Sequence, residues 1–232
     1  MGSSGPRVSL STTTRPRVDV RVVLFTVSEG RLWVALTDKG GLAALPTGEP
    51  VPDEPLDAAA TRILTDDVGV EERYLEQLYS ISASTPEHWT VTVAYLGLAL
   101  AEAGSPPATC ATWYEATNLP EMNVLDRMIV QYALLRLRAK LGYTTIAFHL
   151  LPRTFSLSEL QNVYEAVLNR HLDKRNFRRR IQTEGFLEPT GESRREGSHR
   201  PARLFRFRAA HDADTYLTPA WATNMDGEKS DS

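Results

Sequence analysis

A run of basic side chains at residues 174–180 (KRNFRRR) carries the chemistry that nucleic acids require. Phe177 and Ile181 are apolar and lie four residues apart, so on a helix they share one buried face. At about 100° per residue, Arg175 and Arg179 then point away from that face. Arginine can donate two hydrogen bonds to guanine, and asparagine can bind adenine in the same two-point way. We therefore predict that this helix contacts DNA through Lys174, Arg175, Asn176, Arg178, Arg179 and Arg180.

The segment before the basic run favours this interpretation over a second one, in which the run is only a solvated helix face. Ser156 and Glu159 have the spacing of a capping box, which predicts a helix over residues 157–168. Asp173 can cap the basic helix that follows a short turn. The two helices are therefore expected to form a helix-turn-helix unit.

The segment after the basic run completes this unit. Residues 186–187 and 202–207 predict two short strands, and a polar wing loop is expected over residues 191–200. Helix, turn, helix and hairpin follow in the order typical of a winged helix. Contacts from the wing to phosphates or to the minor groove are expected from Arg194, Arg195, His199 and Arg200.

A second motif lies near the N-terminus and resembles the Nudix box. That box runs Gly, five residues, Glu, seven residues, Arg-Glu-aliphatic, one residue, Glu-Glu, one residue, Gly-aliphatic. The matching positions here are Leu45, Pro46, Thr47, Gly48, Glu54, Arg62, Leu64, Asp66, Asp67, Gly69 and Val70. The resemblance implies a strand, loop, helix arrangement in which the helix carries the acidic positions.

The acids that a Nudix hydrolase uses are altered in this chain. In the family, three helical glutamates on one face hold divalent metal ions that polarise a diphosphate. The matching positions are Ile63, Asp66 and Asp67; isoleucine cannot ligate a metal, and aspartate is one methylene shorter than glutamate. Asp66 and Asp67 are either weak metal ligands or solvated acids at the helix end. We predict that hydrolysis is lost, and the alternative is an active ADP-ribose pyrophosphohydrolase with nonspecific affinity for nucleic acid.

A nucleotide-binding pocket can remain after the metal-binding glutamates are lost, because contacts to the sugar, base and phosphates do not require a metal ion. Lys39, before the box, is a candidate phosphate partner, and Trp89 is a candidate for stacking on a base. An aromatic residue in a β-rich segment is also typical of a core. Glu54 and Arg62 are candidates for ligand contact, although a structural pair within the box is the stronger interpretation.

The candidate residues of the box are positioned by predicted strands and one helix, and a long helix connects them to the basic segment. β-branched runs at residues 19–27, 31–37, 75–82 and 88–100 predict strands, and apolar residues at helical spacing predict a helix at 56–64 that ends before Gly69. A long amphipathic helix, at about residues 121–142, is marked by Val124, Leu125, Met128, Ile129, Tyr132, Leu135 and Leu141. The predicted fold class is α/β (α+β), a Nudix-type mixed-sheet α/β/α sandwich followed by a winged helix-turn-helix domain.

The domain boundaries follow from these elements and from composition. We predict a disordered tail at residues 1–17, a Nudix-like effector domain at 18–142 that includes the connecting helix, a winged helix at 143–210 and a flexible acidic tail at 211–232. The longest strongly apolar stretch, residues 91–101, is too short to span a membrane. One cysteine, Cys110, cannot form an internal disulfide, and no signal sequence is recognisable, so a cytoplasmic protein is expected.

The net charge of −3 conceals two opposite parts. Residues 153–208 contain thirteen lysines and arginines and seven acids, a net charge of +6, which leaves −9 for the rest of the chain. The whole-chain charge argues against a polyanionic partner, whereas the charge of this segment favours one.

Together the two motifs resemble the Nudix-related transcriptional regulators of bacterial NAD metabolism. The resemblance covers about residues 18–207 and is most specific at residues 141–181 and 200–207. It implies a homodimeric repressor of NAD biosynthesis or salvage genes that binds double-stranded operator DNA. It also implies ADP-ribose or a related NAD-derived nucleotide as the effector that releases the operator, with no cofactor required.

Overall fold

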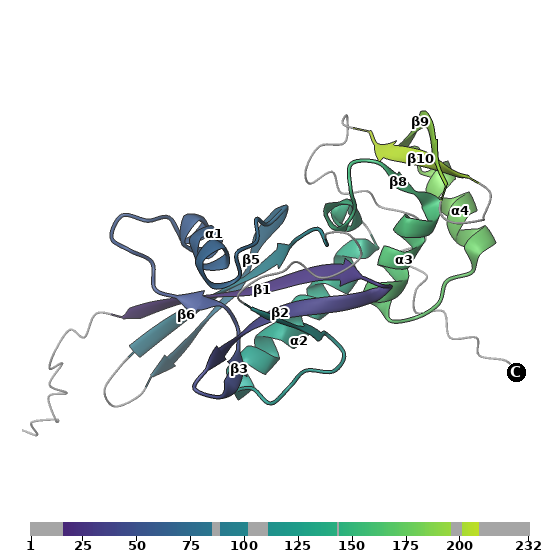
Figure 1. The fold of residues 1–232 in the computed structure, drawn as a ribbon. Coiled ribbons are helices and arrows are strands. Elements are labelled where there is room, and N and C mark those ends of the chain that lie inside the picture. The colour runs from purple at the N-terminus through teal and green to yellow at the C-terminus, as the bar shows by residue number, and fades with distance from the viewer. Residues whose placement is uncertain (1–15, 85–88, 102–110, 143, 196–200, 209–232) are drawn as a thin grey trace, which may run out of the picture.

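The computed structural model describes residues 16–84, 89–101, 111–142, 144–195 and 201–208 (Figure 1). The elements in the first part are β1 (Arg17–Ser28), β2 (Arg31–Lys39), β3 (Leu42–Ala44), β4 (Thr47–Gly48), α1 (Leu56–Asp67), β5 (Tyr74–Ser84), β6 (Trp89–Leu98), β7 (Thr112–Glu115) and α2 (Val124–Leu141). The second part holds the 3-10 helix η1 (Ile146–Leu150), β8 (Phe155–Ser156), α3 (Leu157–Leu168), α4 (Lys174–Thr183), β9 (Leu187–Arg194) and β10 (Ala202–Phe207). The predicted order of strands and helices is confirmed, and β1 begins one residue inside the predicted N-terminal tail.

Within the described residues, the first part of the chain is a seven-stranded mixed sheet between two helices (Figure 1). The main order is β3-β2-β1-β6-β5, with β4 paired to β1 and β7 paired to β2. β1 and β6 run parallel in continuous register from Arg17↔Thr90 to Phe25↔Leu98. The other pairs in this sheet are antiparallel. The mixed α/β/α sandwich is therefore as predicted.

Alternation along β1 explains why both faces of the sheet are covered. Val20, Val22 and Leu24 pack on the α1 side, whereas Val23 and Phe25 pack on the α2 side. All five side chains are fully buried. β1 is thus the central strand, with α1 packed on one of its faces and α2 on the other.

The connecting helix α2 differs from its prediction in two ways. It begins at Val124 rather than near residue 121, because the Asn123 side chain accepts a hydrogen bond from the Asp126 backbone N–H and caps the helix there. Its buried face is formed by Asp126, Ile129, Val130, Ala133, Leu137, Lys140 and Leu141. Four of the apolar residues that were expected to mark the packed face are instead exposed, namely Val124, Met128, Tyr132 and Leu135.

The winged helix is built from η1, α3, α4 and a three-stranded sheet of order β8-β10-β9. The capping box is present: the Ser156 hydroxyl accepts from the Glu159 N–H, and the Glu159 carboxylate accepts from the Ser156 N–H. The helix it starts has the predicted bounds. β9 is longer than predicted and continues to Arg194. Its pairing with β10 shifts register at Gly191, which has a φ of 81°, and the Thr190 hydroxyl donates to Leu204 O at this shift. Such a bulge lets the strand continue past an unpaired residue.

One hydrophobic core joins the two parts of the chain. It begins at Val23 and Phe25 on the α2 side of the sheet and continues through Ile129 and Leu137 of α2. The same cluster reaches Phe186 between α4 and β9. The winged helix therefore packs directly on the sheet layer. Among the described residues, no helix is long and apolar enough to cross a membrane.

Candidate nucleic-acid interface and nucleotide pocket

The helix α4 is fixed by its apolar face and its N-cap. Phe177 is 7% exposed and Ile181 is 2% exposed, and the Phe177 ring packs edge-on against Tyr164 with ring centroids 5.3 Å apart. Burial raises the pKa of the Tyr164 hydroxyl above its usual range, so Tyr164 stays neutral in this core. The Asp173 carboxylate accepts from the Asn176 N–H at 2.8 Å and sets the first residue of the helix. The basic face is therefore held rigidly.

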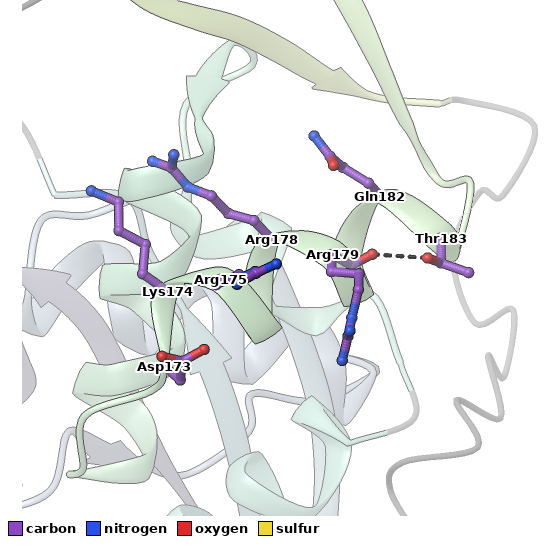
Figure 2. Close-up of a pocket in the computed structure, with 7 residues that line it drawn as sticks. All are labelled: Asp173, Lys174, Arg175, Arg178, Arg179, Gln182 and Thr183. Atoms are coloured by element: carbon purple, nitrogen blue, oxygen red, sulfur yellow. Dashed lines mark hydrogen bonds between the residues drawn. The ribbon is translucent and has the colours of Figure 1, made fainter.

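The long polar side chains of α4 extend toward two sides of the helix (Figure 2). Lys174, Arg178 and Gln182 extend toward one side of the helix, and Arg179 extends toward the other. Arg175 lies on the exposed surface between them, in an open depression of about 740 Å³ along the helix. The predicted outward direction of Arg175 and Arg179 agrees with their exposure.

Four cations of α4 are without an ion pair among the described residues. Lys174, Arg175, Arg178 and Arg179 form no ion pair there, whereas Arg206 on β10 forms two 3.1 Å bonds to a carboxylate, that of Glu188. Asn176 and Arg180 are also exposed on the helix. Positive charges without local acids are available to the phosphates of a nucleic acid.

The wing differs from the prediction in the position of Arg194. This residue lies in β9 rather than in a loop, and its guanidinium is 2.5 Å from a carboxylate oxygen of Glu159, the acid of the capping box. Arg195 follows β9 and is exposed. His199 and Arg200 lie outside the described residues.

A groove beside α4 includes residues that the sequence interpretation missed. Its walls come from the start of α3, from α4 and from the wing, and its lining includes Ser158, Arg178, Gln182 and Arg203. Arg178 Nη2 donates to the Ser158 hydroxyl at 3.2 Å, and the buried Arg178 Nε has no partner in the described residues. A cation with an unsatisfied donor, next to further cations, suits an anionic oxygen. The capping-box helix start was the one sequence signal that pointed to this corner.

The altered Nudix box places isoleucine where the family has a metal-binding acid. Ile63 is 2% exposed on α1 and packs on β4, where a Cβ built on Gly48 lies only 3.1 Å from Ile63 Cγ1. Asp66 is exposed and lies 3.9 Å from Arg62, and the Asp67 carboxylate accepts from the Thr47 N–H at 3.3 Å. The described residues contain no group of three His, Cys, Asp or Glu side chains that suits a metal ion. The residues present therefore do not fit the divalent ions of a Nudix hydrolase.

Glu54 and Arg62 form the structural pair that was the stronger of the two interpretations. Arg62 Nε donates to Glu54 Oε1 and Arg62 Nη2 donates to Glu54 Oε2, both at 2.8 Å. The same guanidinium donates to the backbone oxygen of Glu49, so it fixes the loop between β4 and α1. The hydrogen bonds from Arg62 lower the pKa of Glu54 to about 2.

Lys39 and Trp89 lie at the same end of the sheet as the box. Lys39 is the last residue of β2 and is exposed, and Trp89 is the first residue of β6 and is 46% exposed. Trp89 adjoins the start of β1, because the next residue of β6 pairs with Arg17. Trp89 is therefore not a core residue. Its role in ligand binding, like that of Lys39, stays a prediction.

A polar network links this end of the sheet to α2. The Thr47 hydroxyl donates to Asp19 at 2.9 Å, and Arg21 Nε donates to the same carboxylate group at 2.7 Å. Arg21 also pairs with Asp126 in the first turn of α2, and Asp126 accepts from the Leu45 N–H at 3.1 Å. Asp126 is 2% exposed, so the link is buried. Sequence reasoning missed it because Arg21 and Asp126 are 105 positions apart.

Comparisons with known proteins identify relatives of this chain. The family model described as the NrtR DNA-binding winged helix domain matches residues 147–207. The chain is 35% identical over 213 residues to the ADPR responsive transcriptional repressor NtrR of Acinetobacter baylyi, with 86% of this chain and 84% of that protein covered.

Solved structures are similar over both parts of the chain. The NrtR of Shewanella oneidensis is 28% identical, covers 87% of this chain and 98% of its own, and has a TM-score of 0.74. The same protein complexed with a 27mer DNA is 28% identical, covers 82% of this chain and 93% of its own, and has a TM-score of 0.70.

Proposed function

Because this chain belongs to the NrtR family of transcriptional repressors, we propose that it binds operator DNA through α4 and releases it when ADP-ribose occupies the Nudix-like domain. The observation that carries the proposal is the face of α4, where Lys174, Arg175, Arg178 and Arg179 form no ion pair with the described residues. The operators are those of NAD biosynthesis or salvage genes.

The proposed division of labour on α4 follows from where the side chains lie. Arg175 and Arg179, on the outermost surface of the helix, read base edges in the major groove, where arginine prefers guanine. Lys174 and Arg178, on the side of the wing, hold backbone phosphates. A relative of known structure has been crystallised with a 27mer DNA, which supports DNA as the partner.

The Nudix-like domain acts as a sensor rather than a hydrolase in this proposal. Ile63 fills the place of a metal-binding acid, and the pair of Glu54 with Arg62 keeps the loop of the box in shape without a ligand. ADP-ribose is the proposed effector because the Acinetobacter relative is named as responsive to ADPR. Lys39 and Trp89 are the proposed phosphate and base contacts at the end of the sheet that carries the box.

The proposed coupling runs through α2. The helix of 18 residues is about 27 Å long. Its first turn is tied to the box end of the sheet through Asp126 and Arg21, and near its other end Arg138 Nε donates to Val167 O of α3 at 2.9 Å. An effector releases DNA only to the extent that it binds the released conformation more tightly.

A titration of operator DNA with and without ADP-ribose tests the proposal. Duplexes from upstream of NAD biosynthesis and salvage genes are titrated at a fixed salt concentration of about 100 mM, because phosphate contacts make the affinity depend on salt. We expect Arg175→Ala and Arg179→Ala to abolish retardation of the operator and to leave the affinity for ADP-ribose intact. We expect saturating ADP-ribose to weaken wild-type binding about tenfold or more. Unchanged DNA affinity in both variants contradicts the DNA assignment, and unchanged affinity with ADP-ribose contradicts the effector.

The competing hydrolase is tested by one assay. ADP-ribose is incubated with the protein and magnesium or manganese, and release of AMP is measured. We expect no turnover above the uncatalysed rate, and sustained turnover contradicts the sensor role.

A further inference from the structure

The sheet domain, residues 16–142, meets the winged helix at the start of β5. Leu75 packs with the core cluster on the α1 side, whereas Tyr74 packs against the core that continues into the winged helix. Arg73, the residue before β5, is held to the sheet because its backbone N–H donates to Leu98 O at 2.7 Å. Its guanidinium donates to Leu151 O, just after η1, at 3.0 Å. The start of β5 therefore contacts both parts of the chain.

Tyr74 takes part in a polar cluster through its hydroxyl and in a ring contact through its side. The hydroxyl donates to the Glu76 carboxylate at 2.8 Å and accepts from the Lys140 ammonium of α2 at 2.5 Å. Lys140 is 7% exposed and also pairs with Glu76, so its charge is compensated inside the structure. The Tyr74 ring lies against His149 of η1 with centroids 5.0 Å apart. A cluster of this kind resists displacement, because a shift leaves a buried charge or donor unsatisfied.

Directional contacts hold the winged helix at two of its elements. On α3, Val167 O accepts from Arg138 Nε at 2.9 Å, and after η1, Leu151 O accepts from Arg73. The shared hydrophobic core adds buried area, but hydrophobic contacts are non-directional. Hydrogen bonds depend on angle as well as distance, so they restrict the angle between the two parts.

We propose that Arg73 and Tyr74 are positioning residues that lock the winged helix at a fixed angle to the sheet domain, so that a movement of the Nudix-like domain reaches α4 undiminished. The inference rests on the proposed function, in which ADP-ribose releases the operator. The short connection from the box supports it, because α1 ends at Asp67 and only five residues separate Asp67 from Arg73. Thr61 of α1 also donates to Glu72, the neighbour of Arg73, at 2.5 Å. A change at the box therefore acts on this lock directly.

The first test measures the motion of the winged helix without DNA or effector. A fluorescent dye is attached to Glu192→Cys, at an exposed position of β9, in a Cys110→Ser background, and its nanosecond anisotropy decay is recorded. We expect the winged helix of this parent protein to rotate with the whole chain. We expect the lock variant, Arg73→Gln with His149→Ala, to add a faster component that is slower than the local motion of the dye, because the winged helix then moves against the sheet domain.

Arg127→Gln is the matched control for the lock variant. Arg127 Nη2 also donates to a backbone oxygen, that of Pro120 at 2.8 Å, but this contact lies within the sheet domain. We expect the control to keep the decay of the parent protein. Circular dichroism checks that each variant is folded. A decay of the folded lock variant that equals the decay of the control overturns the lock.

The second test measures how strongly ADP-ribose and operator DNA affect each other. The affinity for DNA is measured with and without saturating ADP-ribose, and the ratio of the two is the coupling factor. We expect a factor of about ten or more in the wild type and in Arg127→Gln, and of less than about threefold in the lock variant. The affinity of the lock variant for each ligand alone should change less than about threefold, since the lock touches neither site.

The coupling factor separates a positioning role from a structural one. Loss of a merely structural contact lowers stability and leaves the factor unchanged. A lock variant with the coupling factor of the wild type therefore overturns the positioning role. A wild type without any coupling contradicts the proposed function alone, because the anisotropy comparison still tests the lock.

Discussion

Replacing Arg178 by glutamine should lower the salt dependence of DNA binding by a calculable amount. Arg178 lies in the groove between α4, α3 and the wing and forms no ion pair with a described residue. Log affinity falls with log salt with a slope of about −0.9 for each phosphate contact, so a dimer that loses one contact in each copy has a slope smaller by about 1.8. Between about 50 mM and 200 mM salt, the ratio of wild-type to variant affinity should therefore shrink by about tenfold.

The matched control is a basic residue in the same domain that already has an acid partner. Arg206 and Glu188 form a two-point pair on β10 and β9, and the double variant Arg206→Gln/Glu188→Gln removes that pair without changing the net charge. We expect the salt slope of this control to equal that of the wild type. Fluorescence anisotropy with one labelled operator, repeated at several salt concentrations, measures both slopes. A slope for Arg178→Gln that matches the wild type refutes the assignment of Arg178 to a phosphate.

Three further predictions concern the Nudix-like domain. Ile63→Glu places a carboxylate in a 2% exposed site and should cost about 2 to 4 kcal/mol in urea unfolding. We expect no AMP release from ADP-ribose in this variant, because Asp66 and Asp67 remain one methylene shorter than the family's glutamates; measurable turnover would show that Ile63 alone accounts for the lost hydrolysis. Glu54→Gln should lower the Tm at neutral pH, and because the pKa of Glu54 is lowered from 4.5 to about 2, this difference should shrink as the pH falls below 4.5. A difference that is constant down to pH 2 speaks against the pair. Asp126→Asn should leave ADP-ribose binding in place and reduce its effect on DNA affinity, and an unchanged effect removes Asp126 from the coupling path.

The elements that the sequence predicted best are those whose ends are set by local hydrogen bonds. The capping box of Ser156 and Glu159 and the cap at Asp173 each involve residues three positions apart. The starts of α3 and α4 could therefore be predicted from the local sequence alone. The start of α2 was placed about three residues too early because the cap at Asn123 was overlooked.

The features that sequence could not predict depend on contacts between distant positions. Arg194 was expected to contact DNA from a loop, but β9 brings it to Glu159, 35 positions away in the chain. The Arg21 and Asp126 pair spans a still larger separation. No periodicity or spacing rule encodes such pairs, since they arise only when the sheet and α2 are assembled.

Helix α2 shows how a correct element can be assigned the wrong buried face. Its apolar residues cover almost the whole circumference, so periodicity alone cannot distinguish the face that packs on the sheet from the face that stays exposed. The structure separates the two sets: Ile129 and Leu137 are buried, whereas Val124 and Leu135 are exposed. The prediction combined both sets into one stripe.

The continuous core limits how an effector could release DNA. A hinge between the sheet and the winged helix would open the contacts that run from Phe25 through Leu137 to Phe186, and each of these side chains is fully or almost fully buried. Exposing such side chains costs about 1.5 to 3 kcal/mol each, which together exceeds the 1 to 3 kcal/mol of a typical allosteric coupling. A rotation of two operator-bound copies relative to one another avoids that cost, because the core of each chain stays packed. We therefore expect ADP-ribose to change the spacing between two α4 helices while leaving each chain internally rigid.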